Sequence, residues 1–152
     1  MTHVPSLIVF CASVFLVALF GSQFQPDAWY RSLDLPAWQP PGWVFAPVWT
    51  VLYLFIALSG WMVWKERGRK ARIALGFWGV QLLINGLWSW IFFGLHRPGL
   101  ALADIVLLLI TLALTLVMFW RISRPATLLL VPYFLWVAYA ATLNLAIWRM
   151  NP

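Results

Sequence analysis

The sequence contains little charge. Asp, Glu, Lys and Arg make up 9% of its 152 residues, whereas an ordinary soluble domain carries about 25%. Hydrophobic residues make up 64%, and the mean hydropathy is +0.88. This composition excludes a soluble globular domain and indicates an integral membrane protein. Membrane topology explains the net charge of +6, as argued below, so we expect no nucleic-acid partner.

The sequence also lacks the residues of most catalytic and metal sites. A single cysteine, Cys11, excludes an internal disulfide and a cysteine-based metal site. The two histidines, His3 and His96, fall on opposite sides of the membrane in the topology derived below, so they cannot share a metal. No carboxylate pair, Ser-His-Asp set, CxxC motif or glycine-rich phosphate loop is present. Hydrolase, redox and nucleotide chemistry therefore have no visible residues, and we expect no metal and no cofactor.

Five apolar stretches are each long enough to cross the hydrocarbon core, which takes about 20 helical residues. They are too long for barrel strands and lack strict alternation. The first stretch has neither a basic start nor a clear cleavage site, so we expect a helix there instead of a cleaved signal peptide. The prediction is an all-α membrane protein, a single domain over residues 1–152 that forms a five-helix transmembrane bundle. The expected helices cover residues 4–23, 44–64, 73–95, 99–120 and 126–148, with an aromatic loop over residues 24–43.

Basic residues gather in two of the connections between these helices. Seven of them lie there: Lys65, Arg67, Arg69, Lys70, Arg72, Arg121 and Arg124. Because basic loops stay in the cytoplasm, these connections and the N-terminus are predicted to be cytoplasmic, and the aromatic loop and the C-terminus to lie outside. The basic cluster could also touch anionic lipid.

The stretch over residues 29–53 contains four tryptophans, two tyrosines and four prolines. Interior prolines remove backbone donors and clash with the preceding turn, so this stretch cannot be one continuous helix. We expect an ordered loop up to about Pro41 and a membrane helix from near Trp43. Trp and Tyr favour the membrane interface, where the ring is buried and the polar atom stays wet. The loop is therefore predicted to be a lid on the membrane surface.

Aromatic and small side chains at helical spacing predict a ligand site beneath this loop. Trp49 and Tyr53 lie one turn apart on the second helix. Trp136, Ala140 and Asn144 repeat every four residues on the fifth helix, and the small Ala140 leaves room between a ring and an amide. A flat apolar ligand with a few polar atoms would suit this arrangement.

The third helix carries Gln81, Asn85 and Trp88 along one stripe. Buried amides are costly in lipid unless they face protein, water or a ligand, so interhelical hydrogen bonding and ligand binding both remain open as their role. Asp104 is the only carboxylate within a predicted span. Pairing with Arg97 or snorkelling to the interface is favoured over a proton relay, which would need further ionisable residues.

Three blocks of the sequence resemble the TspO/MBR family, which includes the tryptophan-rich sensory proteins of bacteria and the mitochondrial translocator protein. They are WYRSLDLPAWQPPGWVFAPVWTVLY, QLLINGLWSWIFFG and VPYFLWVAYAATLN, at residues 29–53, 81–94 and 131–144. The resemblance covers the whole chain and implies a five-helix bundle, usually a homodimer, in a bacterial cell membrane. It also implies a pocket for porphyrins, notably protoporphyrin IX, and for isoquinoline carboxamide or benzodiazepine drugs.

The resemblance further implies which residues line the pocket. Matched by motif, these are Tyr30, Trp49, Asn85, Trp136 and Ala140. The two tryptophans resemble those that some bacterial members are thought to use for light-dependent porphyrin degradation. The run LNLAIWR at residues 143–149 has Leu145 and Ala146 where the mitochondrial proteins have the aromatic part of a cholesterol-recognition pattern, so we do not expect steroid transport.

The first interpretation is thus a membrane receptor or regulator that holds a porphyrin against Trp49 and Trp136 and serves tetrapyrrole sensing or homeostasis. Three alternatives remain open. The protein could be an enzyme that photo-oxidises the porphyrin through the same tryptophans, or a structural partner protein with an empty pocket. It could also transport porphyrin or lipid, although the sequence has little intramembrane charge and no inverted repeat.

Overall fold

The computed structural model describes residues 4–152, so His3 lies outside the described residues. The described part is helical and contains no strand. Its elements are α1 (Val4–Ser22), α2 (Ala28–Arg31), the 3₁₀ turn η1 (Gly42–Val44), α3 (Phe45–Lys65), α4 (Arg69–Ser89), the π-helical turn η2 (Trp90–Gly94), α5 (Pro98–Trp120) and α6 (Arg124–Met150). Within residues 4–152, five helices are long and apolar enough to cross a membrane. The prediction of an all-α, five-helix membrane protein is confirmed.

The boundaries of some helices differ from the expected ones. α4 begins at Arg69, before the expected residue 73, and α6 extends from Arg124 to Met150 instead of covering 126–148. Hydropathy marks only the part of a helix immersed in hydrocarbon. Helical hydrogen bonding continues into the headgroup region, where basic side chains such as Arg69 and Arg124 are tolerated.

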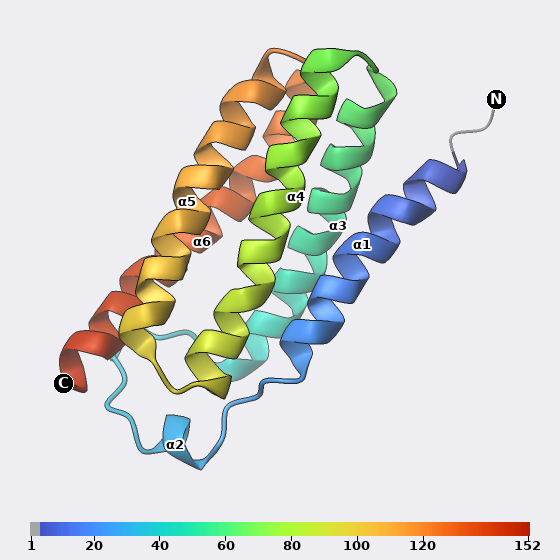
Figure 1. Ribbon diagram of the computed structural model, residues 1–152. Coiled ribbons are helices and arrows are strands. Elements are labelled where there is room, and N and C mark those ends of the chain that lie inside the picture. The colour runs from blue at the N-terminus through green and yellow to red at the C-terminus, as the bar shows by residue number, and fades with distance from the viewer. Residues whose placement is uncertain (1–3) are drawn as a thin grey trace.

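Four of the long helices form a bundle with alternating direction, and α1 packs on its outside (Figure 1). In the bundle α3 contacts α4 and α6, and α5 contacts α4 and α6, while α1 lies against α3 and α4. The loop that contains α2 and the C-terminus lie at one end, here called the loop end. The α3–α4 and α5–α6 connections lie at the other, here called the basic end. The fold therefore separates the aromatic loop from most of the positive charge.

The α3–α4 connection is a tight turn at the basic end. Arg67 has φ 53° and Gly68 has φ 91°, both in the left-handed region that favours glycine. α4 begins directly after this turn, at Arg69. The turn thus brings antiparallel α3 and α4 together with few connecting residues.

Two aromatic side chains packed over a glycine fix α1 on the bundle. The Trp78 indole donates a hydrogen bond to the Ile56 carbonyl at 3.0 Å, and its ring meets the Phe10 ring edge-on at 5.1 Å. Both rings pack over Gly60 of α3, where a Cβ atom would lie 2.7 Å from Trp78 and 2.9 Å from Phe10. Glycine at this position lets α1 approach α3, as small residues do in membrane helix packing.

We predict that Gly60→Ala destabilises the protein by about 1–3 kcal/mol, because the added methyl overpacks against a ring that its own hydrogen bond holds in place. The measurement is the thermal unfolding midpoint in detergent. Gly42→Ala in η1 is the control, since no atom lies within 4 Å of the position of its added methyl. Equal midpoints for the two variants would contradict this account of the α1 contact.

Candidate functional site

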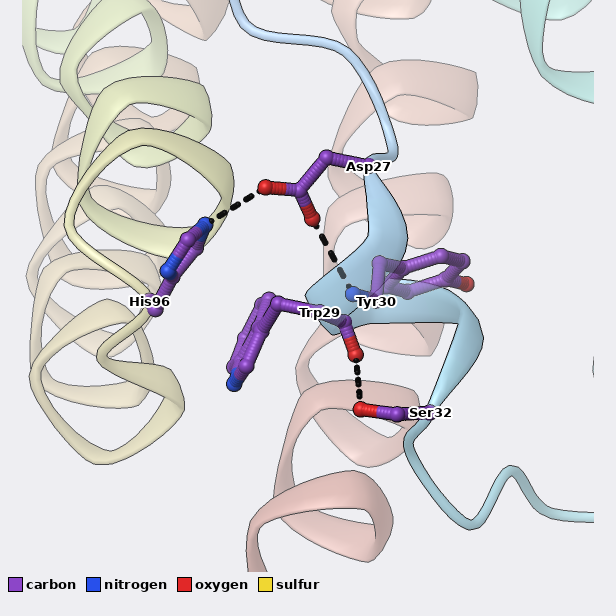
Figure 2. Close-up of polar contacts among 5 residues, drawn as sticks. All are labelled: Asp27, Trp29, Tyr30, Ser32 and His96. Atoms are coloured by element: carbon purple, nitrogen blue, oxygen red, sulfur yellow. Dashed lines mark hydrogen bonds and ion pairs between the residues drawn. The ribbon is translucent and has the colours of Figure 1, made fainter.

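The short helix α2 is attached to the start of α5 through Asp27 and His96 (Figure 2). Asp27 caps α2: one carboxylate oxygen accepts the Tyr30 backbone N–H at 3.1 Å, and the other lies 2.9 Å from His96 Nε2. The Trp29 ring stacks on the His96 imidazole at 4.4 Å between centroids, with a 19° angle between planes. We call Asp27, Trp29 and His96 the α2 latch.

Charge as well as geometry connects the members of the α2 latch. The hydrogen bond from the Tyr30 N–H lowers the pKa of Asp27 below its ordinary 3.8, and the contact with His96 lowers this pKa further. Asp27 is therefore an anion at neutral pH.

Two further contacts hold the middle and the end of the loop. Asn151 forms two hydrogen bonds with the Asp34 backbone: its side-chain oxygen accepts the N–H, and its side-chain NH₂ donates to the carbonyl, both at 2.9 Å. The Tyr139 hydroxyl donates to the Trp38 carbonyl at 3.1 Å. The loop is thus tied to α6 and the C-terminus as well as to α5.

The side chain of Tyr30, a residue of α2, lies in an aromatic cluster directly beneath that helix. Its ring packs edge-on against Phe92 and Phe93 of η2, at 6.2 Å and 5.3 Å. Its hydroxyl accepts a hydrogen bond from Gln39 Nε2 at 2.7 Å. Burial raises the pKa of Tyr30, so the hydroxyl keeps its proton and remains a hydrogen-bond donor. The π-helical turn η2 places two phenylalanines under the loop, and π turns are frequent at functional sites.

A chain of hydrogen bonds crosses the interior of the bundle below this cluster. The Tyr53 hydroxyl donates to Asn85 Oδ1 at 3.0 Å, Asn85 Nδ2 donates to the Tyr133 hydroxyl at 2.9 Å, and Tyr133 donates to Gln81 Oε1 at 2.8 Å. We call this the core hydrogen-bond chain. The Trp49 ring covers it, with its centroid 5.3 Å from that of Tyr53 and 6.2 Å from that of Tyr133.

The sequence analysis did not select Tyr133, although it is fully buried. Its spacing contained the signal, since it precedes Trp136 by three residues and Ala140 by seven and so shares their helix face. Gln81 Nε2 is buried and has no hydrogen-bond partner within residues 4–152. The side-chain NH₂ group of Gln81 is thus a buried donor without a partner among the described residues.

Trp88 and Asn144 form a second link between helices, nearer the loop end. Trp88 Nε1 donates to Asn144 Oδ1 at 3.0 Å, and Asn144 Nδ2 donates to the Pro98 carbonyl at 2.8 Å. The Trp88 ring stacks on Phe92 at 5.0 Å. Asn144 therefore joins α4, α6 and the first turn of α5.

Trp136 belongs to a separate group of rings under the end of the loop. Its ring contacts Phe45 at 5.8 Å and Tyr139 at 5.7 Å. Trp136 and Ala140 pack on the same buried core as Trp49. The structure thus places Trp49, Tyr53, Gln81, Asn85, Trp136 and Ala140 around one core, Tyr30 in the cluster above it, and Trp88 between the two.

Asp104 does not pair with Arg97, since the ion pair found within residues 4–152 is that of Asp27 with His96. Instead its Oδ2 atom is buried, with no hydrogen-bond partner among the described residues. Asp104 lies next to the buried Ile105 on α5, and one of its carboxylate oxygens lies in the protein interior.

We predict that Tyr133→Phe lowers the free energy of unfolding by about 1–3 kcal/mol. The substitution leaves the buried Asn85 donor and Gln81 acceptor without their partner, and orphaned buried groups cost about this much. The measurement is the thermal midpoint in detergent. Tyr139→Phe, on the same helix but bonded to a loop carbonyl, is the matched control and should change the midpoint less. A smaller effect at Tyr133 than at Tyr139 would refute a structural role of the core hydrogen-bond chain.

We also predict that the loop is held less firmly at pH 3 than at pH 6. The lowered pKa of Asp27 means that its carboxylate contributes fully above pH 3.8 and loses its effect as pH falls below that value. Hydrogen exchange of amides 24–41, corrected for intrinsic rates, should therefore be faster at pH 3 than at pH 6. Asp27→Asn keeps the size of the side chain and should reduce this pH dependence, so a pH dependence that persists unchanged in this variant would rule out the α2 latch as its cause.

Comparison with known proteins identifies relatives of the whole chain. The model of the TspO/MBR family matches residues 7–149. The chain is 42% identical over 141 residues to the tryptophan-rich protein TspO of Chlorobaculum tepidum, covering 90% of this chain and 89% of that protein. It is 41% identical over 134 residues to protein CrtK of Rhodobacter capsulatus, covering 87% and 84%.

Similarity extends to the animal proteins. The chain is 40% identical over 153 residues to the human translocator protein, covering 99% of this chain and 87% of that protein. A family match over nearly the whole chain supports a role as a membrane receptor or regulator. The predicted resemblance is confirmed: this multi-pass integral membrane protein belongs to the TspO/MBR family.

Proposed function

We propose that this protein is a membrane receptor or regulator that binds porphyrins of the protoporphyrin IX type, and similar flat apolar ligands such as isoquinoline carboxamides, beneath the loop. One observation supports this most directly: Trp49 and Trp136 present two ring groups on one core at the end of the bundle that the loop covers. A planar macrocycle gains most from aromatic faces on which it can stack. Its role would be tetrapyrrole sensing or homeostasis.

The ligand must displace part of the closed arrangement. The polar atoms of Tyr53, Asn85 and Asn144 already bond to protein groups. A porphyrin would therefore use mainly ring faces and exchange few hydrogen bonds. Tyr30 and Gln39 lie above this region, and the buried Gln39 Oε1 has no partner in the described part of the chain. It is an acceptor that a ligand donor could reach once the loop moves.

Opening of the loop is the step that we expect to admit the ligand. The Asp27 and His96 side chains are 46% and 39% exposed, so water can replace their contact at little cost. The hydrogen bonds of Asn151 and Tyr139 to the loop are exposed as well. The packing of Trp29 and Tyr30 against Phe92 is the larger contact that must open before a ligand can enter.

Two further parts of the proposal concern assembly and orientation. We propose that the basic end faces the cytoplasm, since basic connections stay there. We also propose a homodimer, as the family suggests. Gly76 and Gly79 of α4 have open space where a side chain would project, and small residues allow another helix to approach closely.

The test is a titration of the purified protein with protoporphyrin IX in the dark, followed by porphyrin absorbance. We predict that Trp49→Leu and Trp136→Leu each weaken binding by roughly fivefold, because each lost aromatic contact costs about 1 kcal/mol and 1.4 kcal/mol corresponds to a factor of ten. Trp120→Leu is the control, since Trp120 is exposed at the basic end. Unchanged affinity in both site variants would remove these tryptophans from the site.

The same titration separates the alternatives. Loss of the porphyrin spectrum under illumination, dependent on Trp49 or Trp136, would identify an enzyme that degrades its ligand. A stable spectrum with saturable binding supports a receptor. Porphyrin flux in proteoliposomes would favour a transporter.

A further inference from the structure

The basic end has a concentration of charge that the loop end lacks. Seven of the ten Lys and Arg residues lie there, and Glu66 is the acidic residue among them. At the loop end, three arginines are accompanied by two carboxylates, Asp27 and Asp34. Topology alone requires positive connections but does not require that one of them adjoin an apolar groove.

Such a groove lies between α1 and α3 beside the α3–α4 connection. It measures about 350 Å³ and is lined almost entirely by apolar atoms of Pro5, Ser6, Val9, Phe10 and Trp64. Pro5 and Val9 of its lining are exposed, so within a membrane this groove faces hydrocarbon, and the material that fills it is a hydrocarbon chain.

Lys65 lies between the apolar groove and the other basic residues of the α3–α4 connection. Its Nζ atom lies 3.8 Å from the centre of the Trp61 ring, and Trp61 Nε1 donates at 3.2 Å to Ser6 Oγ, which lines the groove. The Lys65 ammonium group thus lies beside Trp61, which bonds to Ser6 in the lining of the apolar groove. Arg67 follows in the tight turn with φ 53°, and its N–H bonds the Trp64 carbonyl at 3.3 Å.

We propose that this groove is a binding site for an anionic phospholipid of the leaflet at the basic end. One acyl chain lies along Val9, Phe10 and Trp64, and the phosphate lies at the headgroup level against Lys65 and Arg67. The anion is selected because Lys65 and Arg67 follow Trp64 of the groove directly in the chain, whereas the single carboxylate between them, Glu66, is exposed to solvent. The site is separate from the region beneath the loop and does not depend on porphyrin binding.

The chain provides a matched comparison at the same end. Arg121 and Arg124 of the α5–α6 connection also present two cations, and the Arg124 guanidinium lies 5.2 Å from the Trp120 ring centre. That connection lies across the bundle from α1 (Figure 1). If charge alone attracted the lipid, the two pairs of cations would contribute equally to lipid binding. If the groove is the site, only Lys65 and Arg67 contribute.

The experiment is native mass spectrometry of the full chain in micelles with phosphatidylglycerol and phosphatidylcholine that have identical acyl chains. The wild type should retain one phosphatidylglycerol in preference to phosphatidylcholine. Lys65→Gln with Arg67→Gln should weaken this retention by more than tenfold, at roughly fivefold for each cation near the membrane surface. Arg121→Gln with Arg124→Gln should leave it within about twofold.

A second variant tests the apolar half of the site. Val9→Trp fills the groove, leaves every charge in place, and should lower retention of both lipids; its thermal midpoint checks the fold. Equal losses in the two charge-removed variants, or unchanged retention in Val9→Trp, would overturn the groove site in favour of diffuse attraction. Absence of any preference for phosphatidylglycerol in the wild type would overturn the proposal entirely.

Discussion

In the hydrocarbon core there is no water to satisfy polar side chains, so each buried hydroxyl and amide must find a partner within the protein. The Tyr133 hydroxyl meets this requirement for three helices at once, because it bonds Asn85 and Gln81 of α4 from α6, and Asn85 also bonds Tyr53 of α3. Each of these groups fixes the position of the next. The packing of Trp49, which covers Tyr53 and Tyr133, depends on this arrangement.

The same constraint makes the contacts of the helix core costlier to break than those of the loop. Hydrogen bonds of the core lie out of contact with water, where breaking one leaves an orphaned group. The polar contacts that tie the loop to α5 and α6 are largely exposed, so water replaces each partner at little cost. Opening the loop therefore costs less free energy than separating the helices, so we expect a ligand to reach the aromatic rings through the loop.

The sequence was sufficient for the fold because long apolar stretches, tight turns and basic connections are local signals. It left the role of Gln81 and Asn85 open, since spacing shows only that they share a helix face. The spacing of Tyr133 could have placed it on the helix face of Trp136 and Ala140, but its hydrogen bonds to α4 could not be predicted, because single-sequence patterns do not pair distant helices. His96 was considered only as a metal ligand, because its contact with Asp27 depends on how the loop folds back over α5. The π turn at Trp90–Gly94 likewise has no reliable local signature.

Separation of the two ends has a consequence for regulation. The loop end has nearly balanced charges, and the Asp27 carboxylate and the Asn151 hydrogen bonds hold the loop there. The basic end has a large excess of positive charge, which attracts anionic lipid of the adjacent leaflet. Packing of α1 over Gly60 lies nearer the basic end, whereas its C-terminal end leads directly into the loop. A lipid that fills the seam between α1 and α3 would thus stabilise the helix from which the loop begins.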